Sequence, residues 1–110
     1  KISPNTLELI PTGLSIAIPE DLEIQIRPRS GLSAKSSIGV LNAPGTIDSD
    51  YRGEIKVILI NLGQDNFHIL PGMKVAQLIV APIYKAKINY VKKIDSKTKR
   101  GKKGFGSTGL

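Results

Sequence analysis

Residues 14–26 read LSIAIPEDLEIQI, and the two apolar alternations within this stretch decide the fold class. Apolar residues occupy every second position from Leu14 to Ile18, and again from Leu22 to Ile26. A period of two is typical of a β-strand that buries one face. The intervening Pro-Glu-Asp supplies turn residues, so the stretch predicts two strands joined by a turn.

Similar runs continue along the chain, separated by Pro, Gly, Asn and Asp residues that favour turns. Residues 57–60 are continuously apolar, which predicts a strand buried on both faces. No stretch keeps a 3.6-residue apolar period, and only a short helical turn capped by Ser30 is expected. Many short strands predict an all-β fold: a sandwich, a jelly roll or a barrel. The predicted strands are residues 7–10, 14–18, 22–26, 37–41, 55–61, 67–70, 73–80 and 85–91.

The composition excludes several classes of protein. A chain of 110 residues with 40% hydrophobic and 23% charged residues fits one globular domain. It contains no Cys and a single His, His68, which excludes disulfides, thiolate metal sites and a Cys nucleophile, and disfavours a Ser-His-Asp triad. No apolar run reaches the length of a membrane span, and no leader peptide is evident. We therefore expect a cytoplasmic protein without a membrane partner.

The net charge of +7 is concentrated at one end of the chain. Residues 92–110 hold seven basic side chains and one acidic side chain, whereas residues 1–91 are nearly neutral. This division predicts a β domain over residues 1–91 and a basic, Gly-rich C-terminal arm over residues 92–110. Such an arm is either a solvated tail or a segment that binds an anion or a nucleic acid.

Two segments in the first half of the chain carry candidate chemistry. In RPRSGLSAK, residues 27–35, arginine, hydroxyl and glycine groups could bind a phosphate or carboxylate, but composition alone favours a charged strand end followed by a surface turn. In LNAPGTIDSDYRGE, residues 41–54, either Asp48 or Asp50 is the most plausible general base. Tyr51 offers a rigid ring that could form the wall of a pocket.

Two later segments add polar groups. In GMKVAQLIV, residues 72–80, Gln77 is expected to be buried, with its amide bound either to neighbouring backbone or to a ligand. RGKKGFGSTG, residues 100–109, has glycines and hydroxyls that can surround a phosphate. Phe105 is then either exposed by accident or a lid that stacks on a flat ligand such as a base.

In this order and spacing, the four segments resemble the second to fifth motifs of the trimeric dUTPase family. The resemblance implies a jelly-roll-like subunit in a homotrimer, with active sites at subunit interfaces and an arm that closes over a neighbour's site. It implies hydrolysis of dUTP to dUMP and pyrophosphate, which supplies dUMP for thymidylate synthesis and keeps uracil out of DNA. It also implies Mg²⁺ held mainly by the triphosphate, because this hard ion retains oxygen ligands and water.

The resemblance also assigns roles to individual residues. It implies that Asp48 activates the attacking water, that the ring of Tyr51 lies under the deoxyribose, and that Phe105 covers the uracil. The other residues that it implies to bind substrate are Arg29, Ser30, Gly31, Asn42, Gly45, Thr46, Ile47, Lys56, Gln77, Arg100, Gly106, Ser107 and Thr108.

The family's first motif, which resembles A-G-x-D-L, is expected upstream of Lys1, so no metal ligand is expected within this chain. A dCTP deaminase shares the implied fold, but the third and fifth motifs favour a dUTPase. A non-catalytic module that uses the basic arm to bind nucleic acid is the alternative from another class, and salt-sensitive DNA binding without dUTP turnover would favour it. We expect no stable nucleic-acid partner.

Overall fold

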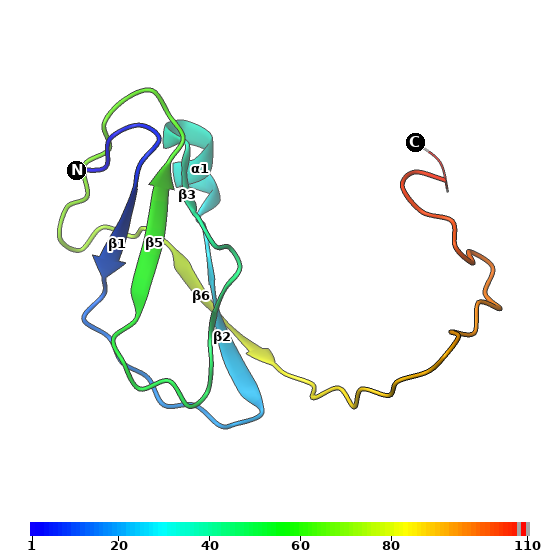
Figure 1. Ribbon diagram of the computed structural model, residues 1–110. Helices are drawn as coiled ribbons and strands as arrows, with labels where there is room; N and C mark the ends of the chain where they lie inside the picture. Colours follow the sequence, from blue (N-terminus) through cyan, green and yellow to red (C-terminus); the bar gives the residue numbers. More distant parts are fainter. Residues whose placement is uncertain (108, 110) are drawn as a thin grey trace.

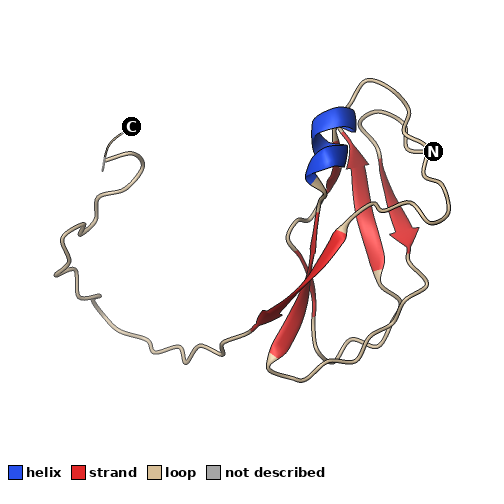
Figure 2. Ribbon diagram, turned by 180° about the vertical axis from the view of Figure 1, so that it is seen from behind, coloured by secondary structure: helices blue, strands red, loops and turns tan. Residues whose placement is uncertain are grey.

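The computed structural model describes residues 1–107 and 109, which build two three-stranded antiparallel sheets (Figures 1 and 2). In one sheet the order is β1 (Leu7–Pro11), β5 (Lys56–Asn61) and β3 (Ile38–Val40). In the other it is β4 (Gly45–Ile47), β2 (Leu22–Arg27) and β6 (Gln77–Pro82), and helix α1 (Ser30–Ser36) leads from β2 to β3. The predicted all-β sandwich is confirmed, and the described strands form no closed barrel.

The core lies between the two sheets and consists almost entirely of branched aliphatic side chains. Alternate residues of β2 and β5 point inward, as the period-two pattern predicts. In register, Ile24 of β2 lies opposite Ile47 of β4 and Val80 of β6. The buried apolar residues are Ile2, Ile24, Ile26, Ile38, Val40, Ile47, Ile55, Val57 and Leu59.

One polar side chain, Asn61 at the end of β5, is fully buried. Its Nδ2 group donates to the carbonyls of Ile2, at 2.9 Å, and Asp65, at 2.8 Å. Its Oδ1 atom accepts from the backbone N–H of Gly63 at 2.9 Å. A buried amide is stable when its hydrogen bonds are satisfied, and here those bonds tie the N-terminus and the loop after β5 to the sheet.

Four of the eight predicted strands differ from the structure. Residues 14–18 join no sheet; Ile16 and Ile18 pack against the core, but backbone groups of this segment bond the loop before β5. Residues 67–70 contribute only a bridge between Phe67 and Ile2, and β6 begins four residues later than predicted. Residues 85–91 form no strand. The alternation of apolar and polar residues indicates which side chains face the core. It does not indicate whether the segment pairs with another strand.

Three finer expectations are also wrong. Ile58 and Ile60 are half-buried rather than buried, because the outer face of β5 is only partly covered. The N-cap of α1 is Arg29, without a side-chain cap, and Ser30 is the first helical residue. Gln77 is exposed rather than buried, because it lies at the start of the edge strand β6.

The chain after β6 extends away from the two sheets (Figure 1). It gives the molecule a Cα radius of gyration of 19.2 Å, compared with about 13 Å for a compact domain of this length. The described part of the chain contains no helix with the length and apolar character that crossing a membrane requires.

Candidate active site

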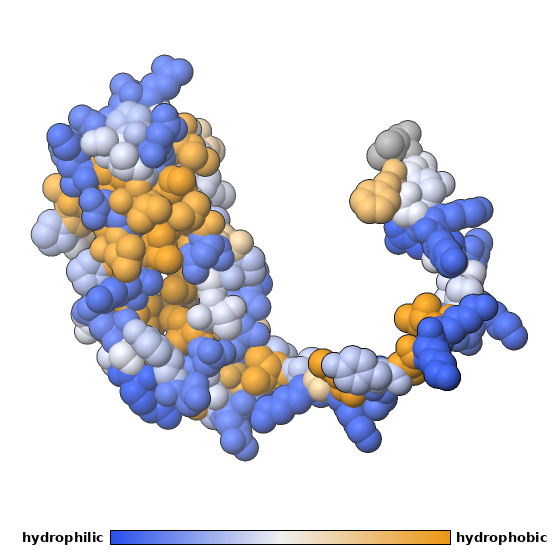
Figure 3. Space-filling model, in the orientation of Figure 1, coloured by the Kyte–Doolittle hydropathy of each residue, from blue (hydrophilic) through white to orange (hydrophobic). Residues whose placement is uncertain are grey.

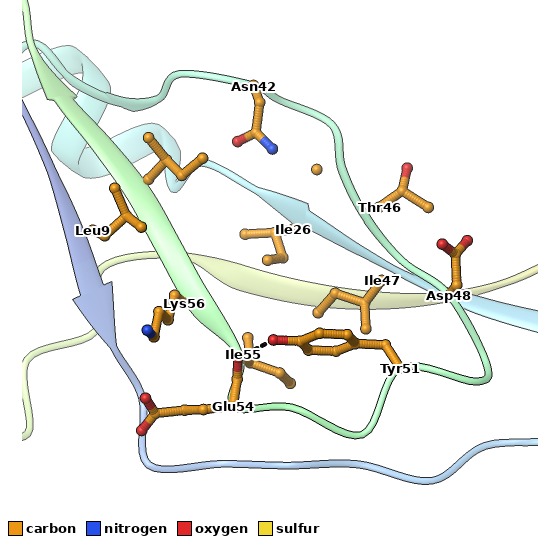
Figure 4. A pocket seen from close by; sticks show the side chains of 12 residues that line it. Leu9, Ile26, Asn42, Thr46, Ile47, Asp48, Tyr51, Glu54, Ile55 and Lys56 are labelled. Atoms are coloured by element: carbon orange, nitrogen blue, oxygen red, sulfur yellow. Dashed lines mark hydrogen bonds between the residues drawn. The ribbon is translucent and has the colours of Figure 1, made fainter.

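A hollow of about 280 Å³ opens between β4, β5 and the loop that joins them (Figure 4). We call it the β4–β5 hollow. It brings together seven residues that the sequence singled out: Asn42, Gly45, Thr46, Ile47, Asp48, Tyr51 and Lys56. The remaining lining residues are Leu9, Ile26, Glu54, Ile55 and Ile58. An apolar floor with a few polar groups at its edge is typical of a small-molecule site.

The two candidate carboxylates differ in position. Asp48, directly after the buried Ile47 of β4, lines the β4–β5 hollow and is exposed to solvent. Asp50 is exposed but does not line this hollow. A general base must reach the proton that it removes, so the geometry favours Asp48 over Asp50.

A tight turn fixes the segment between Asp48 and Tyr51. The N–H of Tyr51 donates to the carbonyl of Asp48 at 3.1 Å. The guanidinium of Arg52 spans the same turn, because its Nη1 group donates to the carbonyl of Ser49 at 2.6 Å. Sequence reasoning assigned Arg52 no role. Its hydrogen bond nevertheless stabilises the turn that sets the position of Asp48 relative to Tyr51.

A second hollow of about 290 Å³ lies beside the N-terminal end of α1, and we call it the α1 hollow. Its lining consists of Arg29, Ser30, Gly31 and Gln77, all four of which the sequence singled out. The Nε2 group of Gln77 donates to the carbonyl of Pro28 at 2.9 Å, which is the structural bond that was one of its two expected roles. The amide therefore ties β6 to the segment that carries Arg29.

A shallower hollow connects the two. It shares one lining residue with the α1 hollow, and two of its residues are sequence neighbours of residues that line the β4–β5 hollow. Gln77 lines it as well as the α1 hollow, and Ala43 and Pro44 connect Asn42 to Gly45 of the β4–β5 hollow. Arg27 also lines it, and the guanidinium of Arg27 is held by Oε1 of Gln25 at 2.6 and 3.1 Å. The candidate residues of the β domain thus follow one connected surface.

The predicted residues of the arm do not join this surface within one chain. The described arm residues make short-range hydrogen bonds, such as that from Nε of Arg100 to the carbonyl of Lys103 at 2.7 Å. The ring of Phe105 is fully exposed, on a residue with a φ of 53°. Gly106 and Ser107 line none of these three hollows, and Thr108 lies outside the described residues.

Metal ligands are sparse in the part of the chain that the structure describes. It holds no group of three or more His, Cys, Asp or Glu side chains that could bind a metal ion. These residues therefore form no all-protein cage for Mg²⁺.

Comparison with known proteins agrees with this geometry. The model of the dUTPase family matches residues 1–109. The chain belongs to the dUTPase family. This confirms the resemblance that the four segments indicated. The relatives of this dUTPase chain include the deoxyuridine 5′-triphosphate nucleotidohydrolase of Brucella melitensis, 58% identical over 106 residues, which are 96% of this chain and 67% of the relative. The enzyme of the same name from Clostridium tetani is 56% identical, over 98% of this chain and 74% of its own length.

Solved dUTPases share the fold of this dUTPase chain. The Staphylococcus bacteriophage 80alpha dUTPase, solved with dUPNHPP, superposes with a TM-score of 0.84 at 25% identity, over 99% of this chain and 79% of the phage chain. The native EIAV dUTPase has a TM-score of 0.71 at 30% identity, over 88% of this chain and 76% of its own.

Proposed function

We propose that this chain is a dUTP diphosphatase, which hydrolyses dUTP to dUMP and pyrophosphate. The observation that carries the proposal is the β4–β5 hollow, where the carboxylate of Asp48, the ring of Tyr51 and the edge of a short strand line a space of about 280 Å³. The names of the Brucella and Clostridium relatives and the dUTP analogue in the phage dUTPase support the same substrate. The product dUMP would feed thymidylate synthesis, and removal of dUTP would keep uracil out of DNA.

In this proposal the β4–β5 hollow takes the nucleoside. Asn42 and the backbone of Gly45, Thr46 and Ile47 read the uracil edge, and the ring of Tyr51 lies under the deoxyribose. A tightly shaped site of this kind rejects bases and sugars that carry extra groups or lack hydrogen-bond partners. Lys56, at the far side of the hollow in Figure 4, contributes positive charge.

Asp48 acts as the general base. Its carboxylate accepts a hydrogen bond from a water molecule and takes a proton as that water attacks the α-phosphorus. The new bond joins the water oxygen to phosphorus, and the bond to the bridging oxygen breaks, so that pyrophosphate leaves. Exposure of Asp48 at the edge of the hollow supports this role, because water and phosphate must both reach it.

The α1 hollow takes phosphate oxygens. Arg29 offers a charged donor fork, Ser30 a hydroxyl, and Gly31 a backbone position that a ligand can approach closely. Gln77 lies at the junction of this hollow with the surface that leads to Asn42, which suits an amide close to the phosphates and the water.

Mg²⁺ enters this proposal as part of the substrate. Because the described residues form no cage for the ion, triphosphate oxygens and water would supply most of its ligands. The ion supplies charge neutralisation when it is bound, whereas the residues of this chain orient the nucleotide and hold the attacking water.

We also propose a homotrimer whose arms close over neighbouring sites. Apolar side chains of β1 and β5 form a patch on the outer face of their sheet (Figure 3), where Leu7 and Leu9 are 45% and 53% exposed. In the extended segment between β6 and the arm, Tyr84, Ile88 and Tyr90 recur at even positions and are 80–99% exposed. Apolar surface of this kind marks an interface in a soluble protein. A neighbour's site would receive Arg100, Phe105, Gly106, Ser107 and Thr108.

The arm is expected to be flexible in the absence of nucleotide. Its hydrogen bonds are local, so no packing against the sheets restrains residues 98–107. Heteronuclear NOE values for these residues should be low in a ligand-free sample and should rise when dUPNHPP is added. Uniformly high values without nucleotide would show that the arm is ordered beforehand.

The proposed activity is tested by pyrophosphate release from dUTP, dCTP, dTTP and UTP in the presence of Mg²⁺. We expect rapid release from dUTP alone. The assay is run on this chain and on a version preceded by the A-G-x-D-L segment. If only the longer version is active, that segment is required for activity. Release from none of the four nucleotides by either version would overturn the proposal. A cytoplasmic location and the absence of a stable nucleic-acid partner stay predictions.

A further inference from the structure

We propose that Gly53 and residues 12–15 are positioning elements for the Tyr51 ring, and that they set how strongly the site prefers deoxyribose to ribose. This inference rests on the proposed function. It concerns residues that make no contact with the nucleotide in that proposal and to which sequence reasoning assigned no role in the site.

The ring of Tyr51 is held at its far end by a single hydrogen bond. Its hydroxyl donates to the carbonyl of Glu54 at 2.8 Å, as the dashed line in Figure 4 shows. At its near end the ring starts from the turn that Asp48 and Arg52 close. Tyr51 as a whole residue is nevertheless 45% exposed, so surrounding side chains do not enclose it. Its orientation therefore depends on the position of the Glu54 carbonyl and on the space beside the ring.

Gly53 provides that space. A Cβ atom at this position would lie 2.5 Å from the hydroxyl oxygen of Tyr51, 2.6 Å from Cζ and 3.0 Å from Cε1. Gly53 is not among the residues with a positive φ, so its backbone conformation is open to any L-amino acid. A glycine is thus required here because the Tyr51 ring occupies the space of a Cβ atom, and not because of the backbone conformation. Any side chain would force the ring away from its present position.

Residues 12–15 fix the backbone that carries the Glu54 carbonyl. The hydroxyl of Thr12 donates to the carbonyl of Ile55 at 2.7 Å, and the N–H of Ile55 donates to the carbonyl of Leu14 at 2.8 Å. The N–H of Gly13 donates to Oε2 of Glu54 at 3.1 Å. The hydroxyl of Ser15 donates to the carbonyl of Gly53 at 3.2 Å. Every residue from 53 to 55 is therefore bonded to this segment.

The test is Gly53→Ala, with the ratio of kcat/KM for dUTP to that for UTP as the readout. We expect the ratio to fall by about 10–100-fold, because a ring that moves by about 1 Å no longer excludes the 2′-hydroxyl. The free energy of unfolding, measured in urea, should fall by much less than this fold-change would suggest, because the backbone conformation at Gly53 is open to alanine. An unchanged ratio in a folded Gly53→Ala variant would overturn the inference.

A double-mutant cycle separates positioning from a general structural effect. Tyr51→Leu removes the ring, and Gly53→Ala added to it should change the ratio by less than about twofold. Additive effects would show that Gly53 acts by another route. Gly39→Ala is the matched control, because a Cβ there meets no atom within 4 Å.

The segment formed by residues 12–15 has its own test. Thr12→Ala removes the hydroxyl that bonds Ile55 and should lower the ratio, whereas Thr12→Ser keeps the hydroxyl and should restore it. If Thr12→Ala leaves the ratio unchanged, the segment has no positioning role. Failure of the proposed function is distinct, since the unaltered protein would then release no pyrophosphate from dUTP.

Discussion

Asp48→Asn is expected to lower the turnover of dUTP by about 10²–10⁴-fold, the range that a positioned general base contributes. Asparagine has nearly the same shape, so the turn from Asp48 to Tyr51 and the β4–β5 hollow should survive. The amide cannot accept the proton of the attacking water. Nucleotide affinity should therefore stay close to that of the unaltered protein, as measured by calorimetry with dUPNHPP.

Asp50→Asn is the matched control for this prediction. Asp50 lies two residues away and is also exposed, but it does not line the hollow. Its variant should retain most of the turnover. If Asp50→Asn loses turnover and Asp48→Asn does not, the two carboxylates have been assigned in the wrong order.

Asn61→Ala is expected to have the largest effect on stability. The substitution removes three hydrogen bonds, those to the carbonyls of Ile2 and Asp65 and that from the N–H of Gly63. The Ile2 carbonyl keeps the bond from the N–H of Phe67 at 2.9 Å. A lost hydrogen bond costs about 0.5–1.5 kcal/mol, so the free energy of unfolding should fall by about 2–4 kcal/mol. That is a large share of the roughly 5–15 kcal/mol typical of a domain. Urea unfolding followed by circular dichroism measures it.

Asn89→Ala, at an exposed position in the extended segment between β6 and the arm, is the control for the loss of an amide. It should change the free energy of unfolding by no more than about 0.5 kcal/mol. Similar changes in the free energy of unfolding for Asn61→Ala and Asn89→Ala would mean that water takes over the hydrogen bonds of Asn61 when its side chain is removed.

The sequence predicted the fold class well because the β-sandwich requires an inward face on each strand. Leu22 to Ile26 and the run around Leu59 show that face directly, and both became strands. The stretch from Leu14 to Ile18 shows the same alternation without a partner strand. Burial and pairing are separate requirements, and a single sequence displays only the first.

The sequence predicted those residues of the candidate site whose side chains carry reactive or ligand-binding groups within a motif. Asp48, Tyr51 and their neighbours were found and lie around one hollow. Gly53, Arg52 and Thr12 were missed because their roles depend on contacts rather than on reactive chemistry. The contacts of Thr12 connect positions about forty residues apart, such as Thr12 with Ile55 at 2.7 Å. The glycine within Tyr-Arg-Gly-Glu was the one available signal, and it was not used.

The strand order has a consequence for how the chain folds. Among the described strands, no two that are consecutive in the chain pair with each other, and the nearest paired residues, such as Ile26 with Gly45, are 19 positions apart. No hairpin can therefore form early as a local nucleus, and folding is expected on the millisecond-to-second timescale of chains dominated by non-local pairing. During synthesis at about 5–20 residues per second, β2 waits several seconds for β6. Until then the backbone edge of β2 that pairs with β6 is open, beside an apolar face, and can pair with another chain.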